Sequence, residues 1–146
     1  MDDVGMGVLE ESECLHLLGK AVIGRVAVSI GAVPAVFPVN FRLVDGYVLF
    51  RTATGTKLDA AMRNAVIAFE VDEVDPMYHE GWSVLVVGIA DELRDQDRVT
   101  SAFELPLAPW APGERSHVVC LRPEFVSGRR IVHSAPATTP LAGSAY

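Results

Sequence analysis

The apolar positions of this chain fall mostly into short runs with a period of two, which is typical of β-strands. Residues 65–71 show the pattern most clearly, because Ala65, Ile67, Phe69 and Val71 would share one face of a strand. The run at 82–93 is apolar on both faces, as expected of a strand buried inside a barrel. Further strand-like runs cover residues 25–30, 34–42, 47–50, 117–121 and 124–132.

Turn residues divide these runs. The pair Asp45-Gly46 between two apolar segments predicts a tight β-hairpin. Pro38 cannot donate a hydrogen bond from its backbone nitrogen, so its part of the strand is expected at a sheet edge or a bulge. The acidic stretch 72–80 reads as a loop leading into the run at residue 82.

Three segments have helical spacing. Ser12 is a candidate N-cap for a first helix, although the acidic residues before it could start that helix earlier, and Gly19 could end it. A second helix is expected near residues 56–63 and a third at 94–104.

Many short strands, tight turns and few helices predict a mainly β fold with added helices, in the form of a six- to seven-stranded antiparallel barrel. We expect one folded domain over residues 12–133. Residues 1–11 are predicted to form a flexible N-terminus, and the Ala-, Thr-, Pro-, Ser- and Gly-rich residues 134–146 a disordered tail.

The net charge of −7 argues against nucleic acid as a partner, because binding to phosphate backbones requires a basic face. It also argues against anionic membranes, and the longest apolar run, at 84–90, is too short to span a bilayer. The two cysteines, Cys14 and Cys120, read as reduced thiols. No basic leader precedes an apolar segment at the N-terminus. These features predict a cytoplasmic protein.

The segment 51–57 concentrates groups that bind phosphate. Arg51 and Lys57 are cationic, Thr52 and Thr56 carry hydroxyl donors, and the stretch joins a predicted strand to a predicted helix. Only two lysines occur in the whole chain, and one is here. A threonine that merely caps the helix explains the same pattern without any ligand, so both interpretations stay open.

The four histidines have no metal-ligand spacing and no neighbouring nucleophile, so the sequence predicts no metal site and names no catalytic residue. His79 lies in the acidic stretch before Trp82. Trp110, which lies among prolines, is expected to serve in packing.

The order of several segments resembles the pyridoxamine 5′-phosphate oxidase-like flavoproteins. The segments that carry the resemblance are residues 24–28, 38–41, 49–58, 68–72, 82–90 and 128–130. Together they span residues 12 to about 132. The chain lacks the basic, aromatic C-terminal segment of the longer oxidases, so the resemblance points to the short, nitroimidazole-reductase-like branch.

This resemblance implies a split β-barrel that binds FMN at the interface of a homodimer. Residues implied to hold the FMN phosphate are Arg51, Thr52, Thr56 and Lys57. Those implied to lie near the flavin ring are Pro38, Val39, Asn40, Trp82 and Ser83, with Arg129 as a contact from the partner subunit.

The function implied is that of an FMN-dependent oxidoreductase that acts on a small soluble substrate. A second reading is a split barrel that carries FMN, deazaflavin or haem without turnover. A third is an interaction domain that binds no cofactor.

Overall fold

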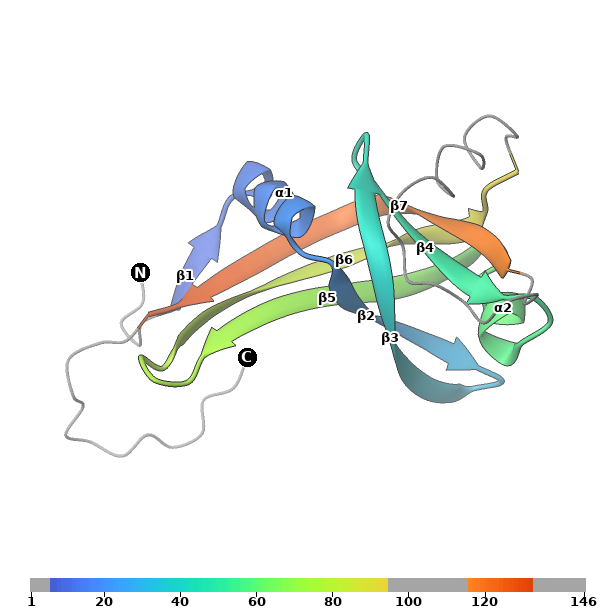
Figure 1. Cartoon of the computed structure of the whole chain (residues 1–146), viewed down its shortest axis with the longest axis horizontal. Helices are drawn as coiled ribbons and strands as arrows, with labels where there is room; N and C mark the ends of the chain where they lie inside the picture. Colours follow the sequence, from blue (N-terminus) through green and yellow to red (C-terminus); the bar gives the residue numbers. More distant parts are fainter. Residues whose placement is uncertain (1–5, 95–115, 133–146) are drawn as a thin grey trace.

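A computed structural model of the chain describes residues 6–94 and 116–132. Within these residues the chain forms seven strands and two helices (Figure 1). In chain order they are β1 (Met6–Leu9), α1 (Glu11–Lys20), β2 (Ile23–Ile30), β3 (Val33–Val44), β4 (Tyr47–Ala53), α2 (Lys57–Ala61), β5 (Ala65–Asp75), β6 (Glu80–Glu92) and β7 (Ser116–Ile131).

All strand pairs are antiparallel, in the order β1-β7-β4-β3-β2-β5-β6. An additional pairing of β6 with β7 closes the sheet on itself. The predicted mainly β barrel is therefore confirmed, with seven strands in the described part of the chain. No helix within residues 6–94 and 116–132 is long and apolar enough to cross a membrane.

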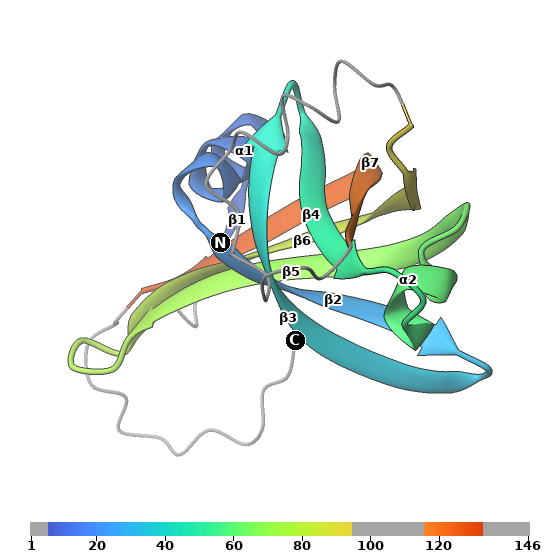
Figure 2. The same cartoon turned by 45° about the vertical axis from the view of Figure 1, so that its right-hand side comes forward.

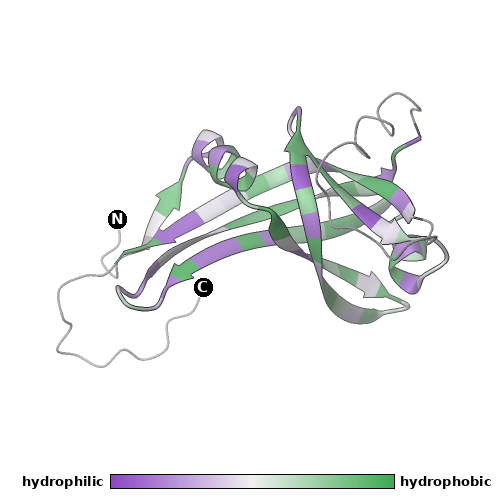
Figure 3. Ribbon diagram, in the orientation of Figure 1, coloured by the Kyte–Doolittle hydropathy of each residue, from purple (hydrophilic) through white to green (hydrophobic). Residues whose placement is uncertain are grey.

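The inward faces of the strands form the core. Phe41 and Phe69 meet at the centre, with their ring centroids 4.8 Å apart in an edge-to-face arrangement. Along β5, the buried side chains are Ile67, Phe69 and Val71, as the period of two predicts. Apolar and polar bands therefore alternate along the strands (Figure 3).

The hairpin and edge predictions are both confirmed. Val44 pairs with Tyr47, and Asp45 and Gly46 have φ values of 51° and 83°, so both turn residues are left-handed. Pro38 lies in the part of β3 that pairs with β2 alone, so the missing N–H removes no ladder bond on the open side.

Several predicted boundaries differ from the structure. Helix α1 begins at Glu11 and continues to Lys20, so Ser12 does not cap it and Gly19 does not end it. β5 continues to Asp75, which makes strand out of residues predicted as loop, because they pair with the start of β6. The sheet also begins before residue 12, since β1 pairs with the end of β7.

The last two predicted strands form one strand, β7. Pro123 does not interrupt it, because a register shift opposite Val87 and Gly88 lets β7 bulge there. The run predicted as apolar and buried on both faces, β6, is buried on one face only: Leu85 is 37% exposed. The helix predicted at 94–104, Trp110 and the tail 134–146 lie outside the described residues, apart from Arg94 itself.

Candidate cofactor site

Strands β3 and β4 separate at a defined point (Figure 2), and the region between their diverging parts, residues 38–40 and 51–57, is called the opening below. They pair only between Phe41–Phe50 and Val44–Tyr47. Beyond Phe41, β3 continues alongside β2, whereas beyond Phe50, β4 continues alongside β7 and leads to α2. Residues 38–40 and residues 51–57 therefore flank the same opening. The structure thus brings together two of the groups that the sequence predicts to contact a cofactor.

The bend between β4 and α2 is organised by Asp59, whose carboxylate is buried. Thr52 donates its hydroxyl hydrogen to Asp59 Oδ1 at 2.7 Å, and the Gly55 N–H donates to Oδ2 at 3.1 Å. Thr56 caps α2 by accepting from the Asp59 N–H at 3.0 Å and donates to the Ala53 carbonyl at 2.8 Å. The cap that the sequence allows at this helix is therefore present at Thr56, whereas Thr52 bonds to the Asp59 carboxylate.

Asp59 also holds a histidine from a distant strand. His117 on β7 pairs with Thr52 on β4, and its Nδ1 lies 2.9 Å from Asp59 Oδ1. On its other side, His117 Nε2 lies 3.7 Å from Glu92. Arg63 bridges the two acids, at 3.5 Å from Asp59 and 3.2 Å from Glu92. This network fixes the bend and borders a hollow of about 410 Å³.

The network explains the ionisation of Asp59. Burial alone would raise the pKa of this carboxyl, but hydrogen bonds from His117, Thr52 and the Gly55 N–H outweigh burial and lower the pKa to about 2. Asp59 is thus a fixed anion, and the Arg63 guanidinium lies 3.5 Å from it.

The four residues predicted to hold a phosphate consequently differ in their contacts. Thr52 points inward and is 1% exposed, and both threonine hydroxyls are used inside the bend. Arg51 lies on the opposite face of β4 from Thr52, since neighbouring strand residues alternate. Burial lowers the pKa of Arg51. Lys57 is exposed at the first position of α2. The two hydroxyls thus serve the bend, and Arg51 and Lys57 are the cationic candidates for contact with a phosphate.

Four other predicted residues share the outer face of the sheet. Pro38 and Asn40 pair with Arg25 and Ile23, whose positions alternate with the buried positions of β2. Ser83 pairs with Arg129, on the outer face of β6 and β7. Paired residues point to the same side of an antiparallel sheet, so all four predicted residues lie on one face.

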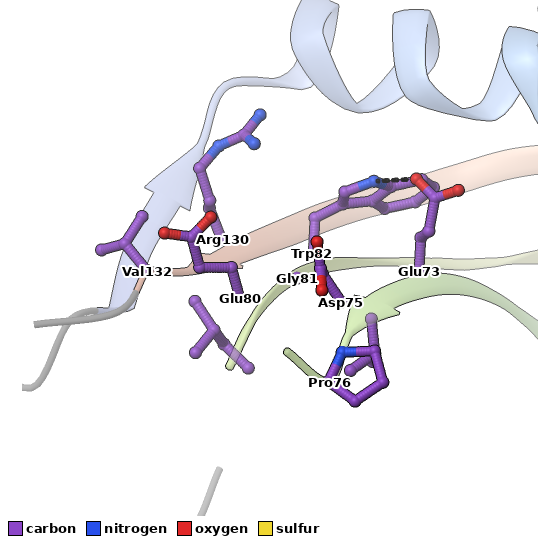
Figure 4. Close-up of a pocket in the computed structure, with 10 residues that line it drawn as sticks. Glu73, Asp75, Pro76, Glu80, Gly81, Trp82, Arg130 and Val132 are labelled. Atoms are coloured by element: carbon purple, nitrogen blue, oxygen red, sulfur yellow. Dashed lines mark hydrogen bonds between the residues drawn. The ribbon is translucent and has the colours of Figure 1, made fainter. Parts of the chain in front are cut away.

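Val39 and Trp82 lie on the other face. Val39 packs against the core. Trp82 also packs against the core, and its indole N–H donates to Glu73 at 3.3 Å. In Figure 4, Trp82 forms one wall of a hollow of about 440 Å³, with Glu80 and Arg130 at its far side. The adjacent residues Trp82 and Ser83 therefore cannot contact one ligand surface through their side chains.

Ser83 and Arg129 line a hollow of about 420 Å³ together with Glu70. Glu70 accepts from Arg25 Nη1 at 2.9 Å, and the same guanidinium lies 3.3 Å from Asp72. The outer face thus carries two carboxylates that share one arginine. The raised pKa of Glu70, about 7, results first from burial and then from the hydrogen bond and charge of Asp72, which together outweigh Arg25.

Two groups of the predicted residues are far apart within one chain: Arg51 and Lys57 at the bend, and Ser83 and Arg129 on the outer face. Thr52 pairs with His117 at one end of β7, and Ser83 pairs with Arg129 at the other. Twelve positions of a strand correspond to roughly 40 Å, and β7 extends along most of the molecule in Figure 1. One chain therefore cannot bring both groups to a single small ligand.

Sequence reasoning missed Asp59 and His117. Thr56 and Asp59 have the spacing of a capping box, a signal that could have identified Asp59. No local signal marks His117, because its contact is made across 58 positions of sequence. His79 lies at the exposed tip of the β5–β6 hairpin. Within the described ranges, no three His, Cys, Asp or Glu side chains are grouped to hold a metal ion.

Comparison with known proteins identifies the family. The family model described as pyridoxamine 5′-phosphate oxidase matches residues 10–130. The chain belongs to this family. The predicted family relationship is thereby confirmed for nearly the whole described part of the chain.

Relatives within the pyridoxamine 5′-phosphate oxidase family include the uncharacterized protein Rv0080 of Mycobacterium tuberculosis. It is 39% identical over 137 residues, which cover 90% of this chain and 88% of Rv0080. Among solved structures, the FAD binding protein from Mycobacterium smegmatis is 37% identical with a TM-score of 0.75, covering 86% of this chain and 99% of that one. An FAD-binding protein from Mesorhizobium loti is 25% identical with a TM-score of 0.73, covering 86% and 97%.

Proposed function

We propose that the protein is a flavin-dependent oxidoreductase that acts as a homodimer on a small soluble substrate. The flavin is bound through the ring, ribityl chain and first phosphate, which FMN and FAD share. Support comes from the family, from two relatives named as FAD-binding proteins, and from the opening between β3 and β4. FMN is the smallest ligand that contains all of the parts for which this site has candidate contacts.

The observation that carries the proposal is the separation of the two groups of candidate residues on one chain. Arg51 and Lys57 flank the opening, whereas Ser83 and Arg129 lie roughly 40 Å away along β7. A two-fold axis across the outer face would set the second group of one subunit beside the first group of its partner. The flavin site is then complete only in the dimer.

The outer face has the side chains that such a contact requires. Ile23, Val66 and Phe125 are 52%, 71% and 54% exposed, and Leu85 is 37% exposed. Large apolar side chains gathered on one sheet face of a water-soluble chain typically mark a protein interface. Their burial against a second copy would remove this apolar area from water.

At the opening, Arg51 and Lys57 would neutralise the phosphate, and the backbone of residues 38–40 would lie beside the ring. The Asp59 network holds the bend in place, so that Thr52 and Thr56 act through position and do not contact the ligand. A bound flavin supplies hydride and electron transfer, while the protein supplies position, charge and exclusion of water.

The visible spectrum of the natively purified protein tests cofactor binding. We expect a yellow protein with absorbance near ~450 nm, as flavin chemistry requires. Extraction and chromatography then distinguish FMN from FAD. A colourless protein that also fails to bind added FMN or FAD contradicts the proposal. Retention of deazaflavin or haem in place of flavin would instead support a cofactor carrier without turnover.

Lys57→Ala should weaken flavin binding by roughly 10- to 150-fold, which corresponds to about 1.5–3 kcal/mol for a charge-assisted hydrogen bond. The matched control is Lys20→Ala, which removes the other lysine of the chain, at the end of α1. Equal flavin affinities of the two variants would show that Lys57 makes no contact with the phosphate.

Turnover separates the oxidoreductase from a carrier. Bleaching of the bound flavin by NADH or NADPH, followed by reoxidation with a small acceptor, is the expected result. A flavin that stays oxidised with both donors, in a protein that retains it tightly, would favour the carrier.

A further inference from the structure

The Glu70 carboxyl occupies an unusual position on the outer face of the sheet. It lines the same hollow as Ser83 and Arg129, and it shares the Arg25 guanidinium with Asp72. Placing two carboxylates on one arginine costs free energy, because their charges repel. The core of the barrel lies on the opposite face of β5, so the Glu70 carboxyl takes no part in it.

We propose that Glu70 is the proton donor of the flavin site. This inference rests on the proposed function, since it assigns a role in the same site. Reduction of most acceptors by a hydride also consumes a proton, and a donor held beside the acceptor accelerates that transfer. No other function described above uses the carboxyl of Glu70.

The register of the sheet fixes the position of Glu70 relative to Pro38. Pro38 pairs with Arg25, Arg25 pairs with Glu70, and Glu70 pairs with Leu85 on β6. These residues form one row across the outer face. Glu70 therefore lies two strands from Pro38, roughly 10 Å away at the usual spacing between strands. A flavin ring beside residues 38–40 would have Glu70 within reach of a substrate stacked on it.

The surroundings of Glu70 hold both groups that raise its pKa and groups that oppose the rise. Arg25 faces it from β2, Asp72 from its own strand and Arg129 from β7 across the hollow. From β6 it meets Ser83 and Leu85, neither of which titrates near neutral pH. Burial and Asp72 raise the pKa of Glu70 to about 7 against the opposing effect of Arg25.

A quinone is an acceptor that takes up one hydride and one proton. When bound and reduced, the flavin would supply the hydride, and Glu70 would supply the proton that completes the hydroquinone. The O–H bond of the Glu70 carboxyl breaks as the new O–H bond forms. The Glu70 carboxylate then regains a proton from water.

The test uses the flavin-loaded protein, reduced with dithionite and mixed with menadione in a stopped-flow instrument between pH 5.5 and 8.5. In the wild type, the rate of flavin reoxidation should fall as pH rises through about 7. In Glu70→Gln it should be about 100-fold lower, the usual contribution of a general acid, and independent of pH in this range. In Asp72→Asn the fall should move to lower pH, because the neighbouring charge is lost.

A second measurement does not depend on turnover. The ¹³C chemical shift of the Glu70 side-chain carboxyl reports its titration directly in the loaded protein. We expect a midpoint near 7 in the wild type and a lower midpoint in Asp72→Asn. If Glu70 is the proton donor, the NMR midpoint and the midpoint of the rate profile should agree in the wild type and again in Asp72→Asn. If Glu70 has only a structural role, the two midpoints should not move together.

The outcomes separate this inference from the proposed function. If Glu70→Gln binds flavin normally and reacts with the wild-type rate and pH profile, Glu70 is not the donor and the flavin function stands. A wild-type midpoint near the ordinary value for glutamate likewise overturns the inference alone. If the wild type binds no flavin, both the proposed function and the proton role are wrong.

Discussion

The substitution Asp59→Asn tests the network that shapes the bend. Asp59 accepts hydrogen bonds from Thr52, Gly55 and His117, and its side chain is 5% exposed. An asparagine keeps the shape but loses the charge, and its NH₂ group would face a donor. The fall in the pKa of Asp59 from 3.8 to about 2 corresponds to roughly 2 kcal/mol of stability at neutral pH.

Urea unfolding at pH 7 and equal protein concentrations measures this loss. With a slope near ~2 kcal/mol per molar urea, the midpoint of Asp59→Asn should fall by about 1 M. The folded-state pKa of Asp59 is depressed, so its stabilising effect is complete above the unfolded pKa of 3.8 and is lost as pH falls through about 2. The difference between wild type and variant should therefore shrink between pH 5 and pH 2.

Asp75→Asn is the matched control. Asp75 also accepts two backbone hydrogen bonds, from Met77 and Tyr78, but it is exposed in a hairpin turn. Its substitution should change stability by less than about 0.5 kcal/mol. Equal midpoints for the two variants, or a difference from wild type that does not vary with pH, would refute the assignment of Asp59 as the buried anion that holds the bend.

Two other predictions concern packing and assembly. Gly128→Ala should destabilise the protein by about 1–3 kcal/mol, since the new Cβ would lie 2.6 Å from the Cys14 sulfur and push α1 away from β7. The control Gly19→Ala, at a position with open space around it, should not destabilise the protein. Thermal unfolding of both variants measures the difference. If the protein is the proposed homodimer, Phe125→Glu should convert it into a monomer in sedimentation analysis, whereas Met77→Glu at the hairpin tip should not. A dimeric Phe125→Glu protein would exclude the outer face as the interface.

The sequence by itself determined the elements whose signals are local. A period of two marked β5, and Asp45-Gly46 marked the hairpin, because these patterns depend on neighbouring residues alone. The order of segments predicted the family and the split barrel. The sequence also located the bend at 51–57 and left two explanations for its threonines.

Only the tertiary structure decided which residues meet. Asp59 and His117 come together because β4 pairs with β7, a contact that no local pattern encodes. β6 is apolar on both faces, yet only one face packs in the core, since sequence hydropathy does not tell which face of a strand is buried. The ends of β7 hold the two groups of candidate residues apart, because strand length sets their distance.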